Sequence, residues 1–89
     1  MKAIVTVLGK DRVGIIASVC AMLSACGVNI LDISQTVMQG YFTMIMLVDV
    51  SGSSKPFADM VSELSEMGKA SELEIRMQRE DIFNAMHRI

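Results

Sequence analysis

Apolar residues recur along this chain at two different spacings, and the spacing separates strands from helices. Residues 2–8 are mostly β-branched and predict a short strand. From Ile15 to Cys26, apolar residues recur three, four and seven positions apart, which predicts a helix with one apolar stripe. Gly27 follows, where a left-handed residue commonly ends a helix. The chain therefore opens with a strand and a helix.

Residues 9–14 predict the turn between this strand and this helix, with Asp11 placed to cap the helix. A second face of the helix carries small side chains. They fit either plain helix propensity or close packing against a neighbouring helix. These residues are Gly14, Ala17, Ser18, Ala21 and Ala25.

Two further strands are predicted at residues 28–38 and 41–50, joined by a tight turn at residues 39–40 into an antiparallel hairpin. The alternation of the first strand slips near residues 31–32, which predicts a β-bulge. The second strand is apolar on both faces. We therefore expect it to be covered on both sides.

A loop-like stretch at residues 51–54 precedes a second helix, which a serine cap and Pro56 in the first turn open and Gly68 ends. Its apolar stripe comprises Phe57, Met60, Val61, Leu64 and Met67. Alternation of apolar with charged or polar residues then predicts a strand with one solvated face. Its apolar positions are Leu73, Ile75 and Met77.

Residues 80–89 predict a last helix, acidic at its start and basic at its end, as the helix dipole favours. Ten residues of isolated helix are marginal in water. We therefore expect this helix to dock on its own domain or on a partner. The predicted order is βαββαβ plus a terminal helix, an α+β, ferredoxin-like two-layer sandwich with a four-stranded antiparallel sheet. We expect one domain over residues 1–89, with a core at 1–79.

The composition indicates that part of the apolar surface lies in an interface with another chain. The chain has 89 residues, of which 52% are hydrophobic and 20% charged, with a net charge of −2. A domain this small cannot bury so many apolar residues alone, so we expect a homodimer. Scattered charges argue against nucleic-acid binding.

No apolar stretch reaches the roughly 18–20 residues of a membrane span. Residues 1–5 begin a strand rather than a signal peptide, so we expect a cytoplasmic protein. Cys20 and Cys26 lie six positions apart, which is neither a metal-binding nor a helical pairing distance. We expect both to be small apolar core residues.

Two motifs carry a family resemblance. Residues 10–16 read Lys-Asp-Arg-Val-Gly-Ile-Ile, and residues 27–30 read Gly-Val-Asn-Ile. At this spacing the chain resembles the ACT domain, a regulatory module that senses amino acids. It is similar in particular to small stand-alone bacterial ACT proteins akin to the regulators of glycine-cleavage genes. Val13 stands where the family usually has proline.

The resemblance implies an amino-acid site in which Asn29 of one subunit closes a site formed by the loop of the other. Free N–H groups at a helix N-terminus suit an α-carboxylate. Asp11 offers an acceptor to an α-ammonium group, and the Asn29 amide both donates and accepts. Asp11 could equally serve only to cap the helix, and Asn29 could equally serve only the turn. The expected ligand-binding residues are Lys10, Asp11, Arg12, Val13, Gly14, Ile15, Asn29 and Ile30.

Catalysis has little support in the sequence. His87 is the one histidine and falls in the terminal helix, and the sequence has no catalytic triad order, metal motif or phosphate-binding loop. We expect that the protein is not an enzyme and that it binds no metal and no cofactor. The leading hypothesis is a homodimeric amino-acid sensor that regulates a partner. The alternative is an adaptor with the same fold that binds a protein without any ligand.

Overall fold

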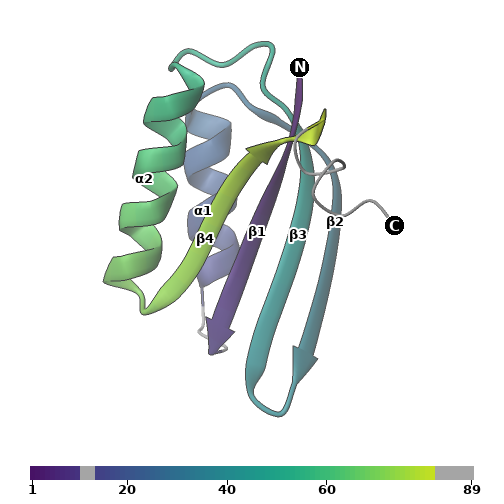
Figure 1. The fold of residues 1–89 in the computed structure, drawn as a ribbon, viewed down its shortest axis with the longest axis vertical. Coiled ribbons are helices and arrows are strands. Elements are labelled where there is room, and N and C mark those ends of the chain that lie inside the picture. Colours follow the sequence, from purple (N-terminus) through teal and green to yellow (C-terminus); the bar gives the residue numbers. More distant parts are fainter. Residues whose placement is uncertain (11–13, 82–89) are drawn as a thin grey trace.

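In the described part of the chain, six elements follow one another as strand, helix, strand, strand, helix and strand. The computed structural model describes residues 1–10 and 14–81, apart from the side chain of Ile15. The elements are β1 (Lys2–Lys10), α1 (Ile15–Ala25), β2 (Asn29–Met38), β3 (Tyr41–Asp49), α2 (Phe57–Ala70) and β4 (Leu73–Arg79). The strands form one antiparallel sheet in the order β2-β3-β1-β4, with both helices against one face (Figure 1). The chain has the α+β, ferredoxin-like fold that the sequence predicts.

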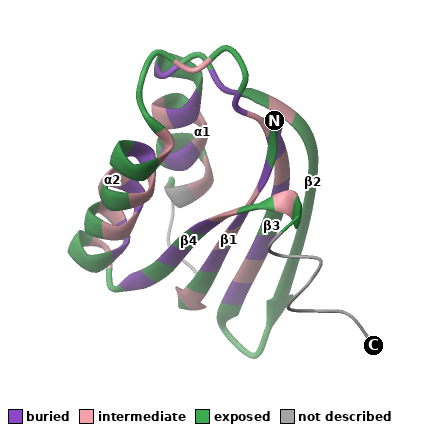
Figure 2. Ribbon diagram, turned by 45° about the horizontal axis from the view of Figure 1, so that its top comes forward, coloured by how far each residue is buried: buried purple, intermediate pink, exposed green. Residues whose placement is uncertain are grey.

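The core lies between the sheet and the helix layer. Val5 and Val7 of β1 and Met44 and Met46 of β3 have no exposed surface, because alternate residues of a strand point to the same face. Leu64 of α2 is equally buried. Figure 2 shows the buried residues on the central strands and on the helix sides that face them.

The end of α1 is a Schellman motif. The Gly27 N–H donates to the Ser24 carbonyl oxygen over 3.0 Å, and the Val28 N–H donates to the Leu23 carbonyl oxygen over 3.0 Å. Gly27 has a φ of 81°, which glycine adopts without steric cost. Val28 and Leu23 are both buried and complete the motif. The predicted left-handed residue at Gly27 is confirmed.

The predicted hairpin and its bulge are also confirmed. β2 and β3 pair in an antiparallel ladder, and the register shifts between Ile30 and Asp32. Gln39 and Gly40 both have positive φ, 51° and 84°, as a tight hairpin turn requires. The turn therefore fixes which residues of the two strands face each other.

The predicted turn after the first strand begins too early. Gly9 and Lys10 continue β1, and Lys10 pairs with Tyr41 of β3. A distant part of the chain thus supplies the hydrogen-bonding partner that lengthens the strand. The N-cap of α1 is Gly14 rather than Asp11, which lies outside the described residues.

Two expectations for the ends of α2 are wrong. The N-cap is Pro56, and no serine caps the helix with its side chain; Ser53 instead donates through its hydroxyl to the Lys55 carbonyl oxygen over 2.8 Å. Gly68 does not end α2 but lies buried inside it. A Cβ at Gly68 would stand 2.7 Å from the Leu73 carbonyl oxygen, so glycine lets α2 approach β4 closely.

The small residues of α1 and its N-cap are exposed in this chain. They are Gly14, Ala17, Ser18, Ala21 and Ala25. Within one chain they fit helix propensity alone, and close packing would require a second chain. The predicted alternation of β4 is confirmed, since its three apolar positions are buried. The predicted last helix falls mostly on residues 82–89, outside the described residues.

Candidate functional site

The first half of the expected site lies where β1 ends and α1 begins. Lys10 is the last residue of β1 and is exposed. Asp11, Arg12 and Val13 lie outside the described residues, so the structure does not test them. Ile15 is the first residue of α1. The segment therefore joins a strand end to a helix N-terminus, as the sequence predicts.

Gly14 gives the start of α1 an unusual backbone. Its φ is 84°, a conformation that residues with a Cβ rarely adopt. Among the described residues, no heavy atom lies within 4 Å of where a Gly14 Cβ would stand. The described first turn of α1 carries no acidic side chain. No acidic side chain of that described turn therefore offsets the positive end of the helix dipole.

The second half of the site lies at the start of β2. Asn29 is the first residue of this strand, is exposed, and pairs with Asp49 of β3. Ile30 is half-buried, pairs with the buried Val48, and packs against the core. Asn29 therefore presents its amide to solvent, whereas Ile30 anchors the strand.

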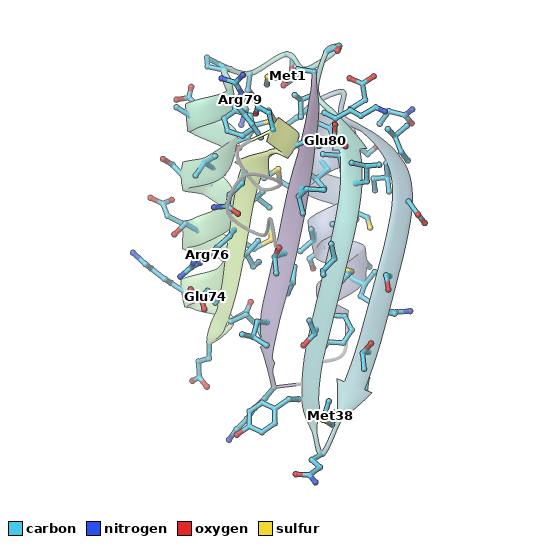
Figure 3. The ribbon with its side chains drawn as sticks, turned by 45° about the vertical axis from the view of Figure 1, so that its right-hand side comes forward. Met1, Met38, Glu74, Arg76, Arg79 and Glu80 are labelled. Atoms are coloured by element: carbon cyan, nitrogen blue, oxygen red, sulfur yellow. The ribbon has the colours of Figure 1, made fainter. Side chains whose placement is uncertain are left out.

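One chain does not bring the two halves together. Lys10 pairs with Tyr41 and Asn29 pairs with Asp49, at opposite ends of β3. Tyr41 and Asp49 are eight positions apart along the strand, which corresponds to about 26 Å. Figure 3 marks the two ends of the sheet with Met1 and Met38. The expected site is therefore split between the two ends of the sheet.

Asp49 gives the Asn29 end a negative charge. The Ser51 N–H donates to Asp49 Oδ1 over 2.9 Å, and the N-terminal ammonium group lies 3.6 Å from the same oxygen. The hydrogen bonds from the Ser51 backbone N–H and then its hydroxyl hold the pKa of Asp49 below its ordinary value. This end of the sheet therefore keeps an ionised carboxylate one strand away from Asn29.

Sequence reasoning missed two residues beside Lys10. Tyr41 pairs with both Lys10 and Met38, so the three residues form one row across β1, β3 and β2. Tyr41 and Met38 are 55% and 67% exposed. The hairpin turn at residues 39–40 was the available signal, because it fixes Met38 opposite Tyr41. The row extends the site region to the sheet edge.

That edge is an exposed, apolar strand. β2 lies at one end of the strand order, so one side of its backbone has no neighbouring strand in the described part of the chain. Its apolar residues Leu31, Ile33 and Val37 are between 41% and 58% exposed. Such an edge is a template for pairing with another strand.

The described residues offer little to a metal or a membrane. Residues 1–10 and 14–81 contain no cluster of three histidine, cysteine or acidic side chains able to hold a metal ion. Cys20 and Cys26 are not joined in a disulfide. Within the same ranges, no helix is long and apolar enough to cross a membrane.

Proteins of very similar sequence span the whole chain. A protein named UPF0237 from Bifidobacterium longum is 54% identical over 88 residues, covering 99% of this chain and 98% of its own. Another from Clostridium acetobutylicum is 56% identical over 89 residues, the full length of both. The similarity is therefore not confined to one motif.

Solved structures and a family model agree on the kind of domain. An ACT domain protein from Streptococcus pneumoniae matches with a TM-score of 0.81 and 42% identity, covering 98% of both chains. A putative glycine cleavage system transcriptional repressor matches with a TM-score of 0.73 and 26% identity, covering 86% of this chain and 44% of its own. The family model of the ACT domain, typically a regulatory amino-acid-binding module, matches residues 2–78. With the βαββαβ order and the motifs at residues 10–16 and 27–30, this shows that the chain belongs to the ACT domain family.

Proposed function

We propose that the protein is a homodimeric sensor of a small amino acid and regulates a partner through binding. The observation that carries this proposal is the split site. Lys10 and Asn29 lie at opposite ends of the sheet, and the apolar edge strand β2 runs between those ends. A second copy that pairs along β2 in antiparallel fashion supplies the missing half at each end.

One register of that pairing is consistent with the alternation of side chains between the two faces of a strand. The bulge leaves residue 31 without a place in the ladder, so nine paired positions run from Asn29 to Met38 and Ser34 is the middle one. If Asn29 of each copy lies opposite Met38 of the other, both side chains point to the same face of the joined sheet, and Ser34 lies on the two-fold axis. Lys10, Tyr41, Met38 and Asn29 of the second copy then share one row. Three strand spacings separate the backbones of Lys10 and that Asn29, about 14 Å. The side chains of the row and the ligand fill this distance.

The chemistry at this row suits a free amino acid. The first N–H groups of α1 bind its α-carboxylate, aided by the helix dipole. Asp11 accepts from its α-ammonium group, and the Asn29 amide of the second copy closes the site with one donor and one acceptor. Lys10, Arg12, Val13, Ile15 and Ile30 shape the pocket around the side chain of the ligand.

Binding rather than catalysis is the proposed output. Within the described ranges, no polar or charged side chain is buried in the core where its pKa would be tuned for acid–base work. The likeness to a putative transcriptional repressor of the glycine cleavage system supports a regulatory role. The two free cysteines fit a reducing compartment such as the cytoplasm. We propose another protein as the partner, because the scattered charges of the chain argue against nucleic acid and, within the described ranges, no helix is long and apolar enough to cross a membrane.

A thermal-shift panel of the twenty amino acids tests the proposal. A ligand at about a hundred times its dissociation constant adds roughly 2.7 kcal/mol to the free energy of unfolding. For a domain of this size, each kcal/mol raises the midpoint by about 4–8 °C. We expect one or two amino acids to raise the midpoint of the unmodified protein.

Two variants test whether the thermal shift depends on the proposed site. Asn29→Ala is expected to abolish the shift, whereas Gln35→Ala, an exposed amide on the same strand, keeps it. A flat panel for all three proteins would contradict the sensor. It would favour the alternative of a ligand-independent adaptor, whose partner binds with or without amino acids.

A further inference from the structure

A groove runs between the first half of α2 and the end of β4. Its volume is about 550 Å³, within the range of about 300–1,000 Å³ that ligand pockets span. We call it the edge groove; its lining includes Phe57, Ala58, Val61, Ser62, Met77 and Arg79. Ala58 and Ser62 are exposed and Phe57 and Val61 are half-buried, so the α2 wall is open to a partner.

The β4 wall of the edge groove is a free strand edge. β4 lies at the end of the strand order opposite to β2, so one side of its backbone has no neighbouring strand within residues 1–10 and 14–81. In Figure 1, α2 lies beyond β4 on the side away from β1. The backbone N–H and C=O groups of such an edge pair readily with an added strand. An extended peptide that pairs with β4 would direct every second side chain toward α2.

An acidic hollow adjoins the edge groove at Ser62, which lines both. The hollow has a volume of about 350 Å³, and its charged residues are Lys55, Asp59, Glu63 and Glu66. The three acidic residues lie four and three positions apart, so they share one side of α2. Three carboxylates against one ammonium group give the hollow a net charge of −2. It therefore favours one further cation.

Glu63 has a carboxylate oxygen left for that cation. Its Oε1 accepts from Lys55 Nζ, whereas its Oε2 is buried and has no hydrogen-bond partner in the part of the chain that the structure describes. The Glu63 side chain is 41% exposed, so rotation of the carboxylate turns this oxygen toward the hollow. Arg79, on the β4 wall, already pairs with Asp81 over 3.0 Å. The uncompensated charge thus lies on the α2 side of the groove.

We infer that the edge groove and the acidic hollow bind an extended segment of a partner protein. This segment carries an apolar residue and, two positions away on the same face, a lysine or arginine. Its main chain pairs with the free edge of β4, and its apolar side chain packs against Val61 and Met77. Its cation reaches past Ser62 into the hollow.

A second copy of this chain fits the surface less well than another protein. The exposed edge strand β2 contains an aspartate and no lysine or arginine, so it supplies no cation. The apolar residues of β4 are buried in their own core and offer nothing to the groove of another copy. The inference rests on the proposed function only in requiring a protein partner, and it needs no amino acid.

Selection from a phage-displayed library of random octapeptides, against the full chain and without amino acids, is the first test. We expect the enriched peptides to have an apolar residue two positions from a lysine or arginine. Enrichment of acidic peptides, or no enrichment, would contradict the inference. A flat thermal-shift panel combined with peptide binding would reject the sensor and keep this inference, and a thermal shift without peptide binding would do the reverse.

Substitutions on α2 locate the bound peptide, with its affinity measured by fluorescence anisotropy. Ala58→Arg places a bulky cation in the edge groove at an exposed position, so we expect affinity to fall at least about tenfold. Ala70→Arg is the same change at the exposed far end of the helix, about 18 Å away, and should leave the affinity unchanged. Equal effects of the two substitutions would place the peptide elsewhere and overturn the inference.

The charge of the hollow is tested with two peptides. Glu63→Gln should weaken binding of the enriched peptide about two- to fivefold, as expected for a partly exposed ion pair. A peptide in which glutamine replaces the lysine or arginine should bind both proteins equally. Losses of the same size for both peptides would show that the hollow does not hold the cation.

Methylation of the peptide backbone tests the pairing with β4. Only every second residue of a strand directs its N–H and C=O groups toward a given neighbour. We therefore expect N-methylation of one alternate set of amides to abolish binding and N-methylation of the other set to preserve it. Tolerance of both sets would contradict strand pairing.

Discussion

Gly27 lies directly against Gly52, so that a Cβ on Gly27 would stand 2.7 Å from the Gly52 carbonyl oxygen. This contact joins the end of α1 to the loop before α2. The Ser54 N–H reinforces it by donating to the Cys26 carbonyl oxygen over 2.8 Å. Asn29 begins β2 two residues later, so the contact sets the position of the amide that the proposed site requires.

We expect Gly27→Ala to destabilise the protein in two ways. The left-handed conformation costs about 1–2 kcal/mol for a residue with a Cβ, and the contact with Gly52 adds to this cost. Gly40→Ala is the control, because Gly40 has a similar φ of 84° and no described atom within 4 Å of its Cβ position. Thermal denaturation should give a larger fall in midpoint for Gly27→Ala. Equal losses would show that the Gly52 contact is unimportant.

In Gly68→Ala, a gain in helix propensity competes with a loss of close packing. Alanine is favoured by about 1 kcal/mol inside a helix, but its Cβ would stand 2.7 Å from the Leu73 oxygen and 3.1 Å from Ile75 Cγ1. Since a backbone atom cannot rotate away, we expect packing to win, with a net loss of about 1–3 kcal/mol. Urea denaturation measures the difference. Ser62→Ala, at an exposed position of the same helix, should be neutral or slightly stabilising, and a stabilised Gly68→Ala would refute the close approach.

Local periodicity predicted most of the fold. The alternation of Leu73, Ile75 and Met77, the slip near residues 31–32 and the glycine at 27 each depend on neighbours in the sequence, and the structure confirms them. Some errors arose where contacts across the fold decide the role of a residue. Lys10 belongs to β1 because Tyr41 pairs with it. Gly68 lies inside α2, where the absence of a side chain makes room for Leu73.

The candidate site was less predictable than the fold. The motif identified the residue types, but only the sheet register shows that Lys10 and Asn29 of one chain lie at opposite ends of the sheet. The same register adds Tyr41 and Met38 to the Lys10 end. Sequence spacing alone does not reveal such a separation, because it follows from the path of the chain through four strands.

Asp49 predicts a pH dependence at the Asn29 end. Its pKa is lower in the folded protein, chiefly because the Ser51 N–H donates to it. Its contribution to stability is therefore present above the unfolded pKa, near 4, and is lost as the pH falls through the lower folded value. Asp49→Asn should be less stable than the unmodified protein at pH 7, with the gap closing below about pH 4.

Melting curves from pH 7 to pH 2.5 measure this gap, which is expected to be small because the carboxylate is exposed. Glu66→Gln, which removes an exposed acid on α2, provides the comparison. A gap for Asp49→Asn that stays constant over the whole range would rule out the proposed linkage to its carboxylate.

The two-fold axis of the proposed dimer passes through Ser34, which makes this residue the sharpest probe of β2 pairing. Ser34 is exposed in one chain, so Ser34→Asp should leave the fold intact. In the dimer, two carboxylates would face each other with Cβ atoms about 4.5–5.5 Å apart, and like charges directly opposite destabilise a strand pair. We expect Ser34→Asp to sediment as a monomer at micromolar concentration, where the unmodified protein sediments as a dimer. Ser62→Asp, the same change on the exposed side of α2, should remain dimeric. A dimeric Ser34→Asp would exclude this register, and a monomeric unmodified protein would exclude the dimer itself.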